Sequence, residues 1–400
     1  MTTKYFMIAG ILLLSACTDT DTQIREITEP VTRAPYDLTP YPIPIEQIEA
    51  STGFISPYFV ADGNAHLSYE LTLSNFNRAS FELISIELVE PDGQVLMSFD
   101  ANYLDAHFYR EGQRPKTGNR ILEGNQYGTA NLWLSLEPEN IPKEFFHRLN
   151  FNIKLSEDRT RDISIDVART EFPKETTLIL SPPVPPGVWF YSMESHRDTR
   201  ILTEGRASYA QRYALDLAMA NEDGTFVDGP IDTLDSYPMC NLPILAAAGG
   251  TVIAIQDGVG DNNPETGERP ERINKDTLVG NSVLIDIGDG LNALYAHLIP
   301  GSLKVKVGDK VKTGDEVGRL GNSGNSDGAH LHFHIETQSG LARPVAGEGV
   351  PYYFKKYQLL DIYSDADLET VFTDNKMLPF KNPPIEKENS LPVGNGIIKF

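Results

Sequence analysis

The stretch from His330 to Glu336 alternates strictly between polar and apolar residues, and this pattern limits it to a β-strand. Residues two apart in a strand point to the same face, spaced by roughly 6 to 7 Å. His330 and His332 therefore share one face, whereas Leu331 and Phe333 face the other way. Neighbouring imidazoles suit one zinc ligand with a general acid/base beside it, although a polar surface strand would show the same pattern.

The size and charge of the chain limit the possible functions. Its 400 residues suggest two or three domains. The formal net charge of −22 is spread along the chain, which argues against nucleic acid as a partner. The apolar content of 40%, with 27 prolines and 32 glycines, is typical of a globular, strand-rich protein with many turns.

The N-terminus has the features of an export signal. Residues 1–17 contain a positive Lys4, then an apolar run that is too short to span a membrane. The run ends at Leu14-Ser15-Ala16-Cys17, which resembles a bacterial lipobox and implies a lipid on Cys17. We expect a lipoprotein anchored to a bacterial membrane; Thr18 after the cysteine favours the outer membrane, facing the periplasm. Residues 18–45 are polar and rich in proline, as in a tether.

The next region, residues 46–180, predicts an immunoglobulin-like β-sandwich, because short alternating segments recur between turn residues. Its histidines, His66, His107 and His147, stand among aromatic or apolar neighbours, and we interpret them as structural or surface residues. The proline-rich residues 181–188 then predict a stiff hinge between domains.

Residues 189–345 predict a second, mainly antiparallel β domain, so the fold class is all-β. The expected strands are Tyr213–Leu217, Thr251–Gln256, Ser282–Ile287, Asn292–Tyr295, Val311–Leu320 and His330–Glu336. The long polar loop Asp257–Gly280 is expected to be either disordered or a wall of a cleft. Residues 346–400 form a C-terminal extension, expected to wrap the surface with a short helix over Leu359–Phe372.

Five motifs in this region resemble one family. They are Gln211–Leu217, Pro243–Val252, Tyr295–Leu298, Val307–Gly318 and Gly321–Glu336. Together, in this order, they resemble the lysostaphin/LytM-type zinc metallopeptidases, which cut peptide bonds in bacterial peptidoglycan. The resemblance covers roughly residues 205–340 and does not extend to residues 20–180.

The resemblance implies a role for four residues of the chain. Asp216 and His332 would bind zinc, while His297 and His330 would transfer protons and stabilise the oxyanion. This division is chemically sensible, because unbound imidazoles titrate near neutral pH. We interpret His334 as a strand residue near the site and not as a ligand.

The third zinc ligand is the point at which this sequence departs from the family. Most members carry a histidine four residues before the ligand aspartate, and here that position is Arg212, whose guanidinium cannot bind a cation. We expect His196, twenty residues before Asp216, to take its place. Arg212 would then support the site or hold a substrate carboxylate through its bidentate fork.

The sequence therefore predicts a zinc-dependent endopeptidase acting on peptidoglycan cross-links. An alternative is a metal-free, degenerate LytM-type module that binds or activates other cell-wall hydrolases. A lipoyl-type barrel over Val305–Gly321 is a weaker alternative, because it leaves the histidines unexplained and offers no lysine at an obvious attachment turn.

Overall fold

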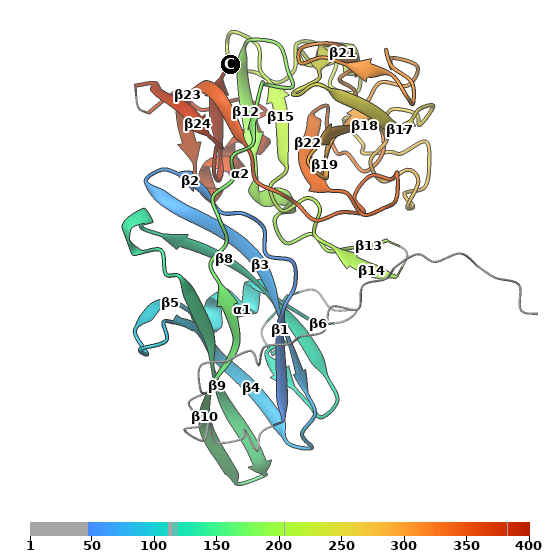
Figure 1. The fold of residues 1–400 in the computed structure, drawn as a ribbon. Coiled ribbons are helices and arrows are strands. Elements are labelled where there is room, and N and C mark those ends of the chain that lie inside the picture. Colours follow the sequence, from blue (N-terminus) through green and yellow to red (C-terminus); the bar gives the residue numbers. More distant parts are fainter. Residues whose placement is uncertain (1–46, 111–114, 117, 204, 382) are drawn as a thin grey trace, which may run out of the picture. The chain divides into compact units, whose positions relative to one another are not determined.

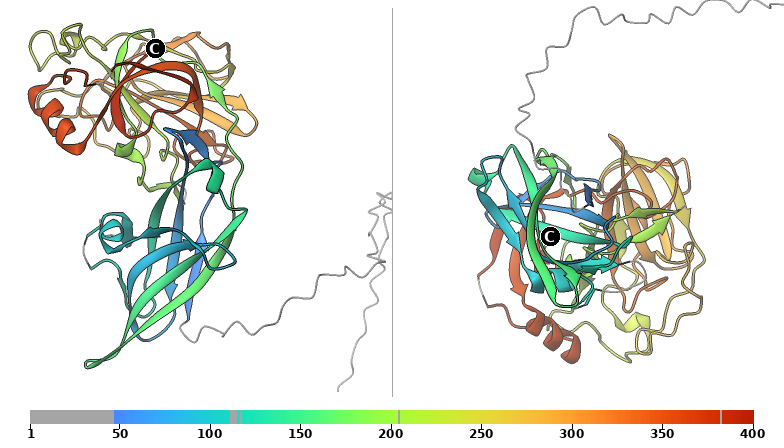
Figure 2. Two further views of the ribbon diagram at one scale, coloured as in Figure 1. Left: turned by 90° about the vertical axis from the view of Figure 1, so that its left-hand side faces the viewer. Right: turned by 90° about the horizontal axis from the view of Figure 1, so that it is seen from below.

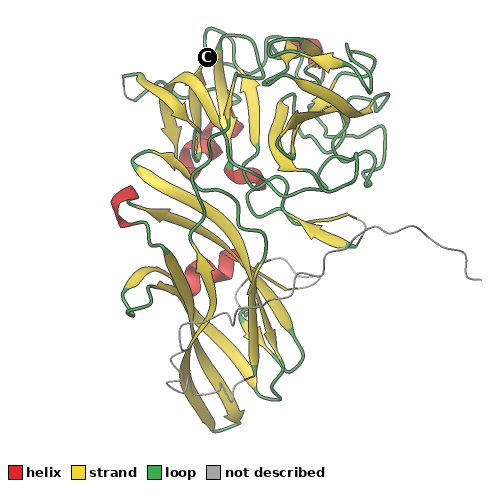
Figure 3. Cartoon of the chain, viewed as in Figure 1, coloured by secondary structure: helices red, strands yellow, loops and turns green. Residues whose placement is uncertain are grey.

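The computed structural model describes residues 47–110, 115–116, 118–203, 205–381 and 383–400. The predicted signal segment, Cys17 and the tether lie outside these residues and stay predictions. Strands dominate the part that is described, as the all-β prediction required (Figure 3). None of the described helices has the length and apolar character needed to cross a membrane.

The first half of the described chain forms two antiparallel sheets (Figure 1). One has the order β1-β3-β8-β6 with β2 beside β3, and the other has the order β10-β9-β4-β5 with β7 beside β4. Leu71 and Leu132 of the first sheet share a buried core with Leu83 and Phe151 of the second, so the two sheets form a sandwich. Its immunoglobulin type stays a prediction. The elements are β1 (Ile48–Thr52), β2 (Phe59–Ala61), β3 (Asn64–Asn75), β4 (Ser80–Val89), β5 (Val95–Phe99), α1 (Ala101–His107), β6 (Phe108–Arg110), β7 (Ile121–Leu122), β8 (Tyr127–Leu136), η1 (Pro138–Asn140), β9 (Glu144–Ser156) and β10 (Arg159–Glu171).

The second half is built on one large sheet, seen from two further sides in Figure 2. Its strand order is β11-β23-β25-β12-β15-β22-β19-β18-β17-β20, with β24 beside β23. Two small sheets, β13-β14 and β16-β21, accompany it. The elements are β11 (Ile179–Leu180), β12 (Val188–Ser192), η2 (Glu194–His196), β13 (Ile201–Thr203), β14 (Arg206–Ser208), β15 (Leu215–Met219), η3 (Leu234–Ser236), β16 (Pro243–Leu245), β17 (Gly250–Gln256), β18 (Asn281–Gly288), β19 (Leu291–Leu298), β20 (Lys310–Val311), β21 (Glu316–Arg319), β22 (Leu331–Thr337), β23 (Tyr353–Tyr363), α2 (Asp365–Asp374), β24 (Ile385–Ser390) and β25 (Asn395–Lys399).

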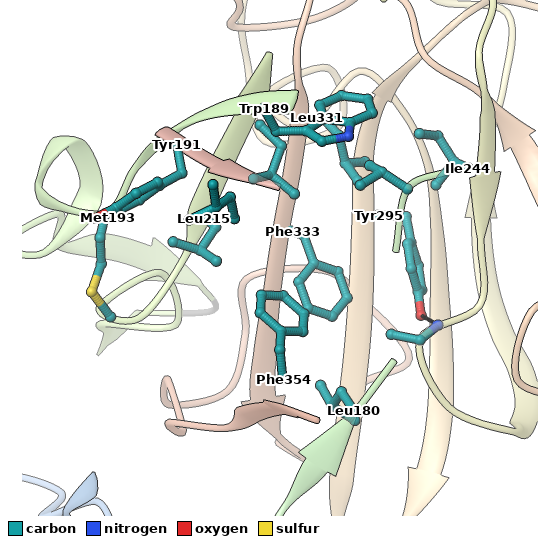
Figure 4. Packing of buried hydrophobic residues seen from close by; sticks show 14 of the residues in the cluster. Leu180, Trp189, Tyr191, Met193, Leu215, Ile244, Tyr295, Leu331, Phe333 and Phe354 are labelled. Carbon is teal, nitrogen blue, oxygen red and sulfur yellow. Dashed lines mark hydrogen bonds between the residues drawn. The ribbon is translucent and has the colours of Figure 1, made fainter. Parts of the chain in front are cut away.

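Strand β22 has the two-faced character that its alternation predicts. Leu331, Phe333 and Ile335 are fully buried in the main core of this half, where Leu331 and Phe333 lie near Tyr295 (Figure 4). Each such side chain contributes roughly 1.5–3 kcal/mol on burial. His332 therefore points to the opposite face, and a shift of one residue in register would expose the core residues instead.

The C-terminal extension differs from the expectation. It does not wrap the surface, because β23 and β25 belong to the large sheet, where β25 pairs with β12. The expected helix over Leu359–Phe372 is also displaced, since Leu359 pairs with Ile398 inside the sheet. Helix α2 begins only after Ser364, whose hydroxyl and Asp367 form a capping box.

The proline-rich segment is not a free-standing hinge. Ser181 N donates to Ala247 O at 3.0 Å, and Leu245 N donates to Pro183 O at 2.8 Å. Val184 is buried in the main core of the second half. The segment is therefore part of the folded C-terminal half.

Candidate metal centre

Asp216 and His332 meet because two strands far apart in sequence pair in one register. Strand β15 runs antiparallel to β22, with Asp216 directly opposite His332. Directly opposite residues point to the same face of a sheet. Asp216 Oδ1 consequently lies 2.9 Å from His332 Nδ1.

His196 reaches the same carboxylate from outside the sheet. It ends the short helix η2, which follows β12, and its Nε2 lies 2.8 Å from Asp216 Oδ2. Ser195, one residue earlier, donates its hydroxyl to the same oxygen at 3.2 Å. His196, Asp216 and His332 thus each offer one donor atom, and the three atoms lie within 4.8 Å of one another.

His297 and His330 lie beside this cluster with the same ring nitrogen held by a backbone carbonyl. His297 Nδ1 lies 2.7 Å from Ser323 O, and His330 Nδ1 lies 2.8 Å from Gly328 O. A carbonyl oxygen can only accept, so each Nδ1 carries the proton and each Nε2 keeps its lone pair in the neutral ring. The two ring centroids are 4.8 Å apart, and His330 Nε2 lies 3.5 Å from Asp216 Oδ1.

The backbone at His297 supports a role for this residue in the site. His297 has a φ of +64°, a left-handed backbone conformation that is uncommon for residues other than glycine. His297 N donates to Val279 O at 3.1 Å, and Gly321 N donates to His297 O at 3.1 Å. These contacts hold the ring over the site in spite of the strained conformation, as is common at functional positions.

The charges of the cluster suit a cation. Burial alone would raise the pKa of Asp216, but His330, His196 and the hydrogen bond from His332 outweigh it and hold the pKa well below its usual range. Burial lowers the pKa of His332 to about 3. Burial also holds the pKa of His297 well below its usual range. At neutral pH the cluster therefore presents the Asp216 carboxylate with neutral rings at His332 and His297, the forms that bind metal. His196 differs: burial alone would lower its pKa, but the charge and hydrogen bond of Asp216 outweigh burial and raise it, so a metal would have to displace a proton from this ring.

His334 contacts His332 on the side of its ring that is opposite Asp216. Its Nδ1 lies 2.9 Å from His332 Nε2, the ring nitrogen that faces away from Asp216. The ring is fully buried, beside the buried Glu336, whose pKa burial raises to about 8. His334 thus contacts a candidate ligand from outside the group of three donor atoms, and it can orient that ligand. That His334 binds no metal itself stays a prediction.

The substrate-clamp role expected for Arg212 is wrong in this structure. Its side chain has no exposed surface, and its guanidinium bonds to Glu70 at 2.6 Å and to Glu348 at 2.8 Å. A buried fork that is already bound to two carboxylates cannot hold a substrate carboxylate. Nothing in the sequence near Arg212 signals Glu70, which lies 142 residues earlier in the chain.

Comparison with known proteins bears on the C-terminal half. Residues 234–344 match the model of Peptidase family M23. This range includes His297, His330 and His332 but begins after Asp216. A curated relative, an uncharacterized metalloprotease of Buchnera aphidicola subsp. Baizongia pistaciae, is 37% identical over 65 residues. That alignment covers 16% of this chain, and the chain spans only 17% of the length of the relative.

A comparison with solved structures also found peptidases, among them two proteins named as M23 enzymes. A mutant catalytic domain of the prophage-encoded M23 protein EnpA from Enterococcus faecalis is 22% identical, covering 44% of this chain and 88% of that chain, with a TM-score of 0.23. The deep-sea M23 metalloprotease pseudoalterin is 17% identical, covering 53% and 96%, with a TM-score of 0.27. A zinc-containing peptidase from Vibrio cholerae is 13% identical, covering 74% and 86%, with a TM-score of 0.21. TM-scores of this size do not establish a common overall arrangement. The family match does identify residues 234–344 as a domain of peptidase family M23.

Proposed function

We propose that this protein is a zinc-dependent endopeptidase that hydrolyses peptide bonds in peptidoglycan cross-links. One observation carries the proposal: His196, Asp216 and His332 offer three donor atoms within 4.8 Å, although the three residues come from separate segments. The M23 domain supports peptide hydrolysis as the reaction. The substrate is inferred from the resemblance to lysostaphin/LytM-type enzymes.

The donor set fits zinc. Two imidazole nitrogens and one carboxylate oxygen are a common set in catalytic zinc sites, which keep a further position open for water. When bound, zinc would lower the pKa of that water and polarise the peptide carbonyl. His196, Asp216 and His332 would hold the ion. His334 would fix the orientation of the His332 ring, because its Nδ1 contacts His332 Nε2.

His297 and His330 would perform the proton transfers. Each keeps a lone pair on Nε2, because a backbone carbonyl holds the proton on Nδ1. An Nε2 in this state can accept a proton from the attacking water, and the resulting imidazolium can then donate it to the leaving amine. The other imidazole can donate a hydrogen bond to the developing oxyanion once it is protonated.

Two measurements test this proposal. The purified protein should contain about one equivalent of zinc by elemental analysis, and it should release new amino groups from isolated peptidoglycan. Chelation should abolish the release, and added zinc should restore it. A protein that binds zinc but leaves peptidoglycan intact while cutting other envelope peptides would change the substrate and keep the enzyme class.

The alternative is a metal-free module that binds cell-wall hydrolases. One observation favours it, namely that Arg212 occupies the position of a usual zinc ligand and supplies no donor atom to the cluster. The convergence of His196 on Asp216 weighs against it, because it restores the third donor. A zinc-free wild-type protein that still binds peptidoglycan or a hydrolase would support the alternative.

The location of this activity is also proposed. We infer that Cys17 is lipidated and tethers the enzyme to a bacterial membrane, in which case the peptidase would act within the cell envelope.

A further inference from the structure

The segment that carries His196 contacts the N-terminal sandwich through the two residues that follow it. Asp198 Oδ2 lies 2.5 Å from Nδ1 of His107, the last residue of helix α1. The Arg197 guanidinium lies over the Trp133 ring, 5.2 Å from its centroid. Arg197 also lies 3.7 Å from Asp198, which links the two contacts into one cluster.

On the sandwich, His107 and Trp133 are themselves held in place by contacts with Tyr103. The His107 ring packs against Tyr103, with centroids 4.3 Å apart. The Tyr103 hydroxyl donates to Asn131 O at 3.0 Å and accepts from Trp133 N at 3.0 Å, which ties α1 to strand β8. His107 and Trp133 therefore form a prearranged surface and are not two mobile side chains.

The segment that carries Asp216 is bound to the sandwich as well. Arg212, four residues before the aspartate, forms its bidentate pair with Glu70 of strand β3. The Tyr213 hydroxyl lies 2.6 Å from Ser56 Oγ and accepts from Ser68 N at 3.1 Å. His196 and Asp216 both lie before the residues that match the M23 model. The two segments that carry these proposed ligands therefore both contact the sandwich.

We propose that the N-terminal sandwich completes the metal centre by positioning His196, with His107 and Trp133 as positioning residues. This inference rests on the proposed zinc site. His196 ends the short helix η2 and is not part of a sheet, so the contacts at Arg197 and Asp198 limit how far its ring can move from Asp216. A ligand that is held in place binds metal more tightly than one that must be ordered during binding.

The test measures zinc affinity of the full chain by competition with a chelator. His107→Ala and Asp198→Ala should each weaken zinc binding by roughly ten- to hundred-fold, the usual cost of losing an outer partner of a metal site. The double variant should be no weaker than either single one, because both remove the same contact. His107→Asn, which keeps a nitrogen donor near the place of Nδ1, should recover much of the affinity.

Control measurements separate positioning from general damage to the fold. Arg148→Ala breaks an exposed ion pair with Asp166 on the same sandwich and should leave zinc affinity unchanged. The unfolding temperature of the zinc-free His107→Ala protein should stay close to that of the wild type. Wild-type zinc affinity in His107→Ala, or an equal loss in Arg148→Ala, would overturn this inference alone. A wild-type protein that binds no zinc would overturn the proposed function and this inference together.

Discussion

His196 Nε2 lies 2.8 Å from Asp216 Oδ2, although twenty residues and a small two-stranded sheet separate them in the chain. This contact supplies the third donor that the arginine at position 212 cannot provide. In the proposed zinc site, His196 would therefore replace the usual histidine ligand, whose position Arg212 occupies.

His196→Ala should therefore remove most of the zinc. We expect the affinity to fall by more than about 100-fold, since loss of an outer partner alone costs roughly 10–100-fold. Ser195→Ala is the matched control, because it removes a hydrogen bond to the same Asp216 oxygen and no expected ligand. Zinc titrations that cannot distinguish His196→Ala from wild type would exclude His196 as a ligand.

Zinc titration combined with activity measurements distinguishes the roles proposed for His332, His297 and His330. His332→Ala should lose both zinc and activity, because its Nδ1 faces Asp216. His297→Ala and His330→Ala should keep zinc and lose roughly 10² to 10⁴ in kcat, the usual contribution of a general acid or base. Near-normal turnover by His330→Ala would contradict its catalytic assignment.

The sequence predicted the positions of the strands at the site better than the pairing between them. Alternation placed β22 within one residue of its observed ends and put His332 and His334 on one face. The pairing of Asp216 with His332 depends on a register between strands 116 residues apart, which a local pattern does not contain. The resemblance to a family supplied that information instead.

Arg212 shows why other predictions failed. Its charge suggested an exposed role near substrate, because arginine is rarely buried without partners. The partners exist, but Glu70 lies in the other half of the chain and Glu348 lies beyond β22. The C-terminal extension failed for a similar reason, since Leu359 is part of a strand only because Ile398 returns to pair with it.

Arg212→Met should destabilise the protein strongly. It would leave Glu70 buried without its cation, and breaking a buried pair in this way costs about 3–5 kcal/mol. Denaturant titrations should show that Arg212→Met/Glu70→Gln recovers part of this loss, because the double variant no longer buries an unpaired charge. A stable Arg212→Met enzyme with a raised KM would instead restore the clamp hypothesis.

Cys17→Ala should release the protein from membranes. The expected anchor is a lipid on this thiol, which the lipobox-like segment Leu14–Cys17 implies. Cell fractionation should find the wild type with membranes and the variant in the soluble fraction or as an uncleaved precursor. A variant that is cleaved normally yet stays with the membranes would show that the anchor lies elsewhere.

The stability of the sandwich should depend on pH through His147. Its ring is fully buried, donating from Nδ1 to Ala168 O at 3.0 Å and accepting at Nε2 from the Tyr69 hydroxyl at 2.7 Å. Burial lowers the pKa of His147 to about 4 from its usual 6.5. The unfolded chain therefore takes up a proton at a higher pH than the folded one, so stability is fully present above about 6.5 and is lost as pH falls towards 4. The difference between 6.5 and 4 corresponds to about 3 kcal/mol of folding free energy.

Denaturant titrations of wild type and His147→Gln test this dependence. The free energy of unfolding of wild type should exceed that of the variant by a margin that shrinks by about 3 kcal/mol between pH 7 and pH 4. An advantage that stays constant over this range would show that His147 does not titrate as its burial requires.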